Sequence, residues 1–141
     1  MGESGAAGDP WSFGLEFLVR DYELDIQGIV NNANYQHYFE HARHEFLKAR
    51  GLDFAAMHAA GVDPVVYRIE VDYKSPLRSG DRFLVRLRVG REGRLKLVFH
   101  QEAVKLPSGV LAAAAKVAVA MTRGGRPVPP SDEVVAALLA P

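Results

Sequence analysis

The sequence contains no cysteine, and this absence excludes several kinds of chemistry. Without a thiol there is no disulfide framework, no thiolate nucleophile and no cysteine-based zinc site. The composition is compatible with a reducing compartment, and we expect a cytoplasmic protein.

An excess of one charge is also missing, because 17 Lys and Arg residues balance 17 Asp and Glu residues. The charged residues are spread along the chain and form neither a basic stripe nor an acidic tail. We therefore expect no nucleic-acid partner and no membrane partner.

Long apolar runs are absent too. A membrane-spanning helix needs about 18 consecutive apolar residues. The alanine-rich segment 110–121 is shorter and contains Lys116. The opening MGESGAAGDP lacks the basic-then-apolar order of a secretory signal. We expect a soluble protein with a flexible tail over residues 1–10 and a single domain over residues 11–141, a length that suits one hydrophobic core.

The first two regular segments differ in the period of their apolar residues. Over residues 13–19 apolar side chains alternate with others, which is typical of a half-buried strand. From Asn34 to Ala49 they recur at helical spacing, and Gly51 stands where a helix would end. The pattern predicts a strand followed by one amphipathic helix of about four turns that begins near Asn32.

Four further strands are predicted after the helix, over residues 65–74, 83–89, 95–104 and 110–122. The segment 75–81 reads as a turn, and Gly90 and Gly93 are expected to shape the next tight connection. Successive strands joined in this way should be antiparallel neighbours. Ser131 is expected to cap a short final helix. The fold class is therefore α+β, with one long helix packed on a curved antiparallel sheet of about five strands.

The link between the first strand and the helix is the best candidate for chemistry. Asp25 lies in this link, and Gly28 allows the backbone to pass close to another group. The free amides of residues 31–34 at the helix start could hold a carbonyl oxygen as it becomes negative. Asp25 could then attack the carbonyl or take a proton from water. The alternative is that Asp25, Asn31 or Asn32 only caps the helix.

The run DYELDIQGIVNNANYQHYFEHARHEFL resembles the opening motif of the hotdog-fold thioesterases of the 4-hydroxybenzoyl-CoA thioesterase class, and most closely that of the acyl-lipid thioesterase-like subgroup. The later run VDYKSPLRSGDRFLV is consistent with the same family. The resemblance spans roughly residues 13–130. It implies a hotdog fold and hydrolysis of an acyl-CoA or acyl-carrier-protein thioester without a cofactor.

Carried over residue by residue, the resemblance implies catalytic roles for Asp25 and for the helix-start amide at Asn32. Asn31-Asn32 replaces the aromatic residues of the benzoyl-specific enzymes, which favours a fatty or β-ketoacyl substrate. The resemblance also implies substrate-binding residues in the loop, at the helix entry and in the turn after the 65–74 strand, and a basic group that would bind the carrier's phosphates. These residues are Gly28, Val30, Asn31, Asn34, Tyr35, Tyr73, Lys74, Ser75, Arg91, Arg94 and Lys96.

The resemblance also implies a homodimer, possibly assembled further into a tetramer, in which the turn around Ser75 faces Asp25 of the partner subunit. An open sheet would otherwise expose an unpaired edge strand. Arg91, Arg94 and Lys96 could alternatively form only a solvated hairpin face.

Two other functions and one other site remain open at this point. A hotdog hydratase or dehydratase would need a histidine over the substrate, and His37 lies too far into the helix to fit well. A module that binds an acyl thioester without catalysis would need no acid at position 25. His37, His41 and His44 share a helix at spacings that can ligate a metal, although no HExxH motif is present, and we expect no metal.

Overall fold

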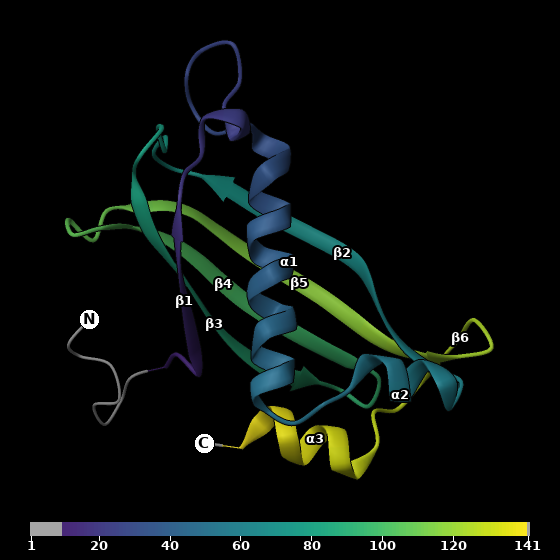
Figure 1. Ribbon diagram of the computed structural model, residues 1–141. Coiled ribbons are helices and arrows are strands. Elements are labelled where there is room, and N and C mark those ends of the chain that lie inside the picture. The colour runs from purple at the N-terminus through teal and green to yellow at the C-terminus, as the bar shows by residue number, and fades with distance from the viewer. Residues whose placement is uncertain (1–9, 141) are drawn as a thin grey trace.

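The computed structural model describes residues 10–140 and contains a six-stranded antiparallel sheet crossed on one face by a long helix (Figure 1). The predicted flexible tail over residues 1–10 lies outside the described residues except for Pro10. The elements are β1 (Phe13–Leu18), the 3-10 helix η1 (Asp21–Glu23), α1 (Asn32–Ala49), α2 (Phe54–Ala59), β2 (Val62–Tyr73), β3 (Arg82–Glu92), β4 (Lys96–Leu106), β5 (Leu111–Arg123), β6 (Arg126–Val128) and α3 (Asp132–Leu139). The predicted α+β arrangement is confirmed.

The strand order is β1-β3-β4-β5-β2, with β6 beside the end of β5. Consecutive strands β3, β4 and β5 are antiparallel neighbours, as predicted. The expectation is wrong for β2, which pairs with β5 at the far edge instead of with β3. The segment 75–81 is therefore a crossover from one side of the sheet to the other, and its Leu77 is fully buried under the helix entry.

The inner face of the sheet follows the alternation of the sequence. Phe83, Val85 and Leu87 of β3 are completely buried against the helix layer. Gly90 was expected to lie in a turn, but β3 continues through it to Glu92. The turn instead depends on Gly93, whose φ of +67° lies in the left-handed region that favours glycine.

The helix α1 is 18 residues long, about five turns, and thus longer than predicted. Asn31 caps it by accepting a hydrogen bond from the Ala33 amide at 2.9 Å. Phe39, Ala42 and Phe46 are at most 1% exposed and pack on the sheet, where short alanine side chains of β5 leave room for the helix.

The strand β2 forms an exposed edge of the sheet. Its outer side has no neighbouring strand within residues 10–140. Apolar residues along it remain 37–54% exposed, namely Val65, Val66, Tyr67, Ile69 and Tyr73. The alternation that predicted this strand is present, but it does not separate a buried face from a solvated one.

Two short elements were missed and one was predicted. The six-residue helix α2, capped by Asp53, occupies a region expected to be a loop, and β6 adds three residues to the sheet. The predicted final helix is confirmed as α3, with the Ser131 hydroxyl accepting from the Val134 amide at 3.2 Å. None of the helices found between residues 10 and 140 is both long and apolar enough to span a membrane.

Truncation of Phe46 should destabilise the fold strongly. This fully buried ring packs against Phe13 of β1 and Phe99 of β4, with centroid distances of 5.6 and 6.5 Å. Phe46→Ala should lower the free energy of unfolding by about 3–5 kcal/mol. Denaturant unfolding at a fixed protein concentration measures this. Gln36→Ala, on the exposed side of α1, is the control and should change stability by less than about 0.5 kcal/mol. Equal effects of the two substitutions would contradict the packing described.

Candidate active site

The loop before α1 is closed by a tight turn at residues 25–28. The Asp25 amide donates to the Ile29 carbonyl at 2.8 Å, and the Gly28 amide donates to the Asp25 carbonyl at 3.0 Å. Gly28 has a φ of +79°, and a Cβ atom there would meet nothing within 4 Å. The glycine is thus explained by its left-handed backbone and not by the close approach expected from the sequence.

The Asp25 carboxylate is held by the backbone of its own loop. Its Oδ1 accepts from the Gln27 amide at 2.8 Å and from the Ile29 amide at 3.4 Å. No group within residues 10–140 donates to its Oδ2. Asp25 is only partly buried. It therefore does not cap the helix, and one carboxylate oxygen is fixed while the other is open to a reactant.

The amides at the helix start are not equivalent. Asn31 donates to the Glu23 carbonyl at 3.0 Å, Ala33 donates to the Asn31 side chain, and Asn34 donates to the Asn31 carbonyl at 2.9 Å. Among the amides of residues 31–34, only that of Asn32 makes no hydrogen bond to the described part of the chain. The expected set of free donors is thus reduced to one, at the first residue of α1.

Asn34 and Val30 fasten the loop to its surroundings. The Asn34 side chain donates through Nδ2 to the Glu23 carbonyl at 2.8 Å. Val30 is 3% exposed and its amide donates to the Leu77 carbonyl at 2.8 Å. Both were expected to bind substrate, but the structure places Val30 in the core and uses the Asn34 amide group to hold η1 against α1.

Two tyrosines pack side by side next to the helix start. Tyr35 is 3% exposed, and its ring meets that of Tyr73 at a centroid distance of 5.4 Å and an interplanar angle of 71°. The Tyr73 hydroxyl donates to the Asn32 carbonyl of the same chain at 3.3 Å. Burial raises the pKa of Tyr35 to about 12, so its hydroxyl remains protonated at neutral pH.

Lys74 and Ser75 follow at the end of β2, and both of their amides donate to the Ala112 carbonyl, at 2.8 and 3.2 Å. The Lys74 side chain is exposed, and Ser75 is partly buried. The backbone bonds tie the end of β2 to β5, and the Tyr73 side chain places it beside α1.

The three basic candidates lie at the other end of the sheet. Arg91 donates to the Arg94 carbonyl at 2.8 Å, and Lys96 lies 3.3 Å from a Glu92 carboxylate oxygen. Arg91 lies nine positions along β3 from Arg82, a distance of about 30 Å in an extended strand. Arg82 is the end of β3 that lies close to the crossover that contacts the Asp25 loop. Within one chain, these residues cannot share a small site with Asp25.

The helix histidines are not brought together as ligands. His41 packs edge-on against Phe17, and His44 against Phe54, with centroid distances of 5.9 and 5.2 Å. Burial lowers the pKa of His44. Within residues 10–140, no three His, Cys, Asp or Glu side chains are grouped closely enough to hold a metal ion.

Sequence reasoning missed a buried polar pair on the helix. Arg43 is 8% exposed and donates to the Gln101 Oε1 at 2.9 Å, and Gln101 Nε2 donates to the Phe39 carbonyl at 3.0 Å. Burial lowers the pKa of Arg43, although Glu40 partly opposes this effect. The sequence did contain a signal for the burial of Arg43, since this residue follows Phe39 by four positions and therefore lies on the buried stripe of the helix.

The arrangement around Asp25 is suited to carbonyl chemistry. As far as the structure describes the chain, one short loop and the helix that it enters carry a carboxylate oxygen without a donor and an amide without an acceptor. Such an amide can stabilise a developing oxyanion, and the positive end of α1 adds to the effect.

The comparisons of this chain with known proteins agree on one protein family. The model of the thioesterase-like superfamily matches residues 19–138. The chain is 39% identical over 94 residues to the chloroplastic acyl-acyl carrier protein thioesterase ATL3 of Arabidopsis thaliana, an alignment that covers 67% of this chain and 50% of the relative. It is 34% identical over 120 residues to a putative esterase of Aquifex aeolicus, covering 85% and 92% of the two chains. The chain spans about half the length of the plant relatives that it matches.

Solved structures show the same fold. A hypothetical protein of Aquifex aeolicus superimposes with a TM-score of 0.83 at 33% identity, covering 90% of this chain and 99% of that one. A 1,4-dihydroxy-2-naphthoyl-CoA thioesterase from Synechocystis gives a TM-score of 0.84 at 19% identity, with 89% and 94% coverage, which supports the fold alone. The predicted hotdog fold is confirmed, and the chain belongs to the thioesterase-like superfamily.

Proposed function

We propose that the protein hydrolyses acyl thioesters carried by coenzyme A or acyl-carrier protein. The observation that supports this most directly is that, in the described part of the chain, an Asp25 carboxylate oxygen without a donor and an Asn32 amide without an acceptor stand at the two ends of one short loop. A water molecule adds its oxygen to the carbonyl carbon, the C–S bond breaks, and the products are a carboxylic acid and the carrier thiol. The Asn32 amide stabilises the oxyanion that forms in between.

Asp25 acts on the carbonyl in one of two ways. As a nucleophile it forms an acyl anhydride that water then cleaves, and as a general base it takes the proton from the attacking water. In both cases the Gln27 and Ile29 amides orient the carboxylate. The plant relatives are named acyl-acyl carrier protein thioesterases, which supports an acyl thioester on a carrier protein as substrate. We propose a fatty or β-ketoacyl chain because Asn31-Asn32 stands where the benzoyl-specific enzymes carry aromatic residues.

We also propose that the protein is a homodimer joined through β2, and that two such dimers can associate further. An unpaired edge strand with exposed apolar side chains favours pairing with a second copy. Edge pairing would bring the basic hairpin with Arg91, Arg94 and Lys96 from one chain toward the Asp25 end of the other, where it could contact carrier phosphates.

Replacement of the Asp25 carboxylate should abolish most of the hydrolysis. Asp25→Asn keeps an oxygen that can accept from the Gln27 amide, so the loop should stay folded, but the amide is neither a base nor a good nucleophile. The kcat for a panel of fatty and β-ketoacyl thioesters should fall by about 10²–10⁴-fold. Release of free thiol measures the rate.

The matched control is Asp21→Asn, which alters an exposed carboxylate bonded to the Ser79 hydroxyl in the same segment. It should retain the wild-type rate. A wild-type kcat in folded Asp25→Asn, with an unchanged melting temperature, would refute the assigned role of Asp25.

A charge placed on the β2 edge should weaken the dimer. Ile69→Lys puts two like charges near the centre of a two-fold contact, and light scattering should show a shift from dimer to monomer mass at micromolar concentration. Leu18→Lys is the control, because Leu18 is an exposed apolar residue on the opposite edge strand. A wild-type protein that is monomeric under these conditions would contradict the proposed assembly.

A further inference from the structure

Asn34 occupies a place in α1 that the needs of the helix do not explain. It is the third residue of the helix, where asparagine is a poorer helix former than alanine or leucine. The usual advantage of asparagine at a helix start is as a cap, and Asn31 already has this role. The Asn34 side chain instead donates to the Glu23 carbonyl at 2.8 Å, outside the helix. The residue therefore serves a contact with η1.

Glu23 is a well-fixed partner for this bond. Its carboxylate accepts from the Arg20 amide at 2.8 Å, across the length of η1. Its carbonyl accepts a second bond, from the Asn31 amide at 3.0 Å. Two donors from the first turn of α1 thus hold the end of η1. Asp25 follows Glu23 by only two positions, so the Asp25 loop is attached to the helix through Glu23.

The tip of the Asp25 loop provides no apolar anchor of its own. Ile26 is fully exposed, and Gln27 and Gly28 are exposed as well. Figure 1 shows this loop projecting beyond the start of α1. The bond from the Asp25 amide to the Ile29 carbonyl closes the loop on itself but does not hold it against the helix. The orientation of Asp25 relative to α1 therefore depends on the hydrogen bonds at the base of the loop.

The backbone of Asn34 orients the other reacting group. Its amide donates to the Asn31 carbonyl at 2.9 Å. This carbonyl and the Asn32 N–H belong to one planar trans peptide group, in which they point in opposite directions. A bond that fixes the carbonyl therefore fixes the direction of the Asn32 amide. Asn34 thus contacts both sides of the site, through its backbone and through its side chain.

We propose that Asn34 is a positioning residue for thioester hydrolysis, which keeps the Asp25 carboxylate and the Asn32 amide in a fixed relation. The proposal rests on the function proposed above and gives the Asn34 side chain a role other than substrate binding. Loss of the side-chain donor leaves both reacting groups in place chemically but frees the loop to move relative to the helix. A displacement of about 1 Å in an active site can lower a rate by about 100-fold.

Two substitutions at this position test the bond to Glu23. Asn34→Ala removes the donor, and Asn34→Asp keeps the shape of the side chain but has no proton to donate at neutral pH. Aspartate is also favourable near a helix N-terminus, so α1 should stay folded. Both variants should lower kcat by about 10–100-fold on an acyl-CoA that the wild type hydrolyses. KM should change by less than about twofold, because a positioning residue does not contact the substrate.

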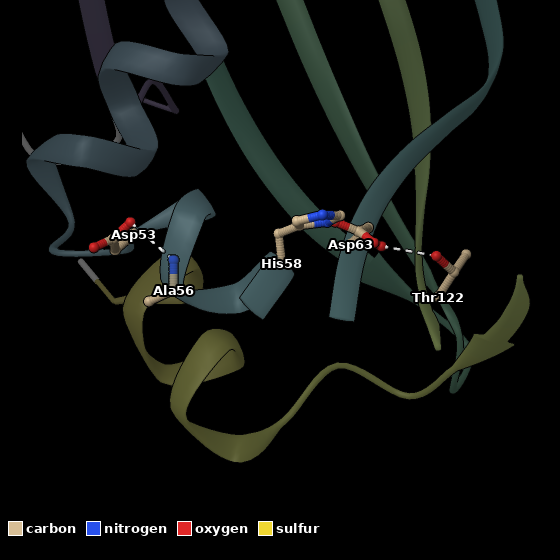
Figure 2. A network of polar contacts seen from close by, with 5 residues as sticks. All are labelled: Asp53, Ala56, His58, Asp63 and Thr122. Atoms are coloured by element: carbon tan, nitrogen blue, oxygen red, sulfur yellow. Dashed lines mark hydrogen bonds and ion pairs between the residues drawn. The ribbon is translucent and has the colours of Figure 1, made fainter. Parts of the chain in front are cut away.

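The matched control is Thr122→Val, which removes a bond of the same kind near the opposite end of β2 (Figure 2). The Thr122 hydroxyl donates to the Asp63 carbonyl at 3.1 Å, so this pair also joins a side chain to a distant backbone carbonyl. Its loss should lower the melting temperature to a similar extent and leave kcat unchanged. A wild-type kcat in Asn34→Ala, or an equal loss in Thr122→Val, would overturn the proposal.

The pH dependence separates the hydrogen bond from the added charge. Below its pKa, about 3.9 for an ordinary aspartate, the introduced carboxyl group carries a proton that it can donate to the Glu23 carbonyl. The ratio of kcat in Asn34→Asp to wild-type kcat should therefore rise severalfold from pH 7 to pH 5, while the ratio for Asn34→Ala stays constant. The neighbouring ionisable groups, among them Glu23, Asp25 and His37, are common to all three proteins. A loss confined to Asn34→Asp would trace the effect to charge and would contradict the role of the bond.

Amide hydrogen exchange tests the positioning without catalysis. In Asn34→Ala, exchange should become about tenfold faster at Asn31, which shares the Glu23 acceptor, and at Gln27, which bonds to the Asp25 carboxylate. Amides of β3 should stay protected. A reduced kcat with unchanged exchange would point to direct substrate contact and would refute the positioning role. A wild-type protein without thioesterase activity would instead refute the proposed function, and the exchange rates would then decide whether Asn34 fixes the loop.

Discussion

The structure depends on the burial of one side of α1 against the inner face of the sheet. Phe39, Ala42 and Phe46 leave almost no accessible surface there, and the alanines of β5 allow the close approach. Burial of this kind is the dominant favourable contribution to folding. It also fixes the direction of the helix (Figure 1), so that the N-terminus of α1 always meets the loop with Asp25 and its C-terminus always meets α2 and α3.

The position of the start of α1 sets where the Asp25 carboxylate and the Asn32 amide lie relative to each other. Two donors, the Asn31 amide and the Asn34 side chain, converge on the carbonyl of Glu23 and hold the loop against the helix. The loop then closes on itself through Asp25, and the Asn32 amide finds no acceptor among residues 10–140. In the proposed reaction, groups held in this way would need little rearrangement when negative charge develops on a substrate oxygen.

Features set by neighbouring residues were predictable from the sequence, and features set by distant ones were not. The period of 34–49, the cap at Ser131 and the alternation of β3 each depend on a few adjacent positions. The pairing of β2 with β5 depends on competition between strands, which local patterns do not encode. The sequence placed Asp25 in the loop, but the hydrogen bonds that leave one of its oxygens open arise from the turn around Gly28. An apolar pocket of about 350 Å³ beside the C-terminal half of α1 joins residues from Glu40 to Leu138, too far apart for any motif.

The outer walls of the pocket have a consequence for divergence within the superfamily. The helices α2 and α3 are short, lie outside the contact between α1 and the sheet, and are joined to it through the links that follow α1 and β6. Substitutions there can enlarge, shrink or reshape the apolar space beside α1 without contacting the loop that carries Asp25. The shape of this pocket and the geometry of the Asp25 loop are thus set by separate parts of one small domain, and the one can change while the other stays the same.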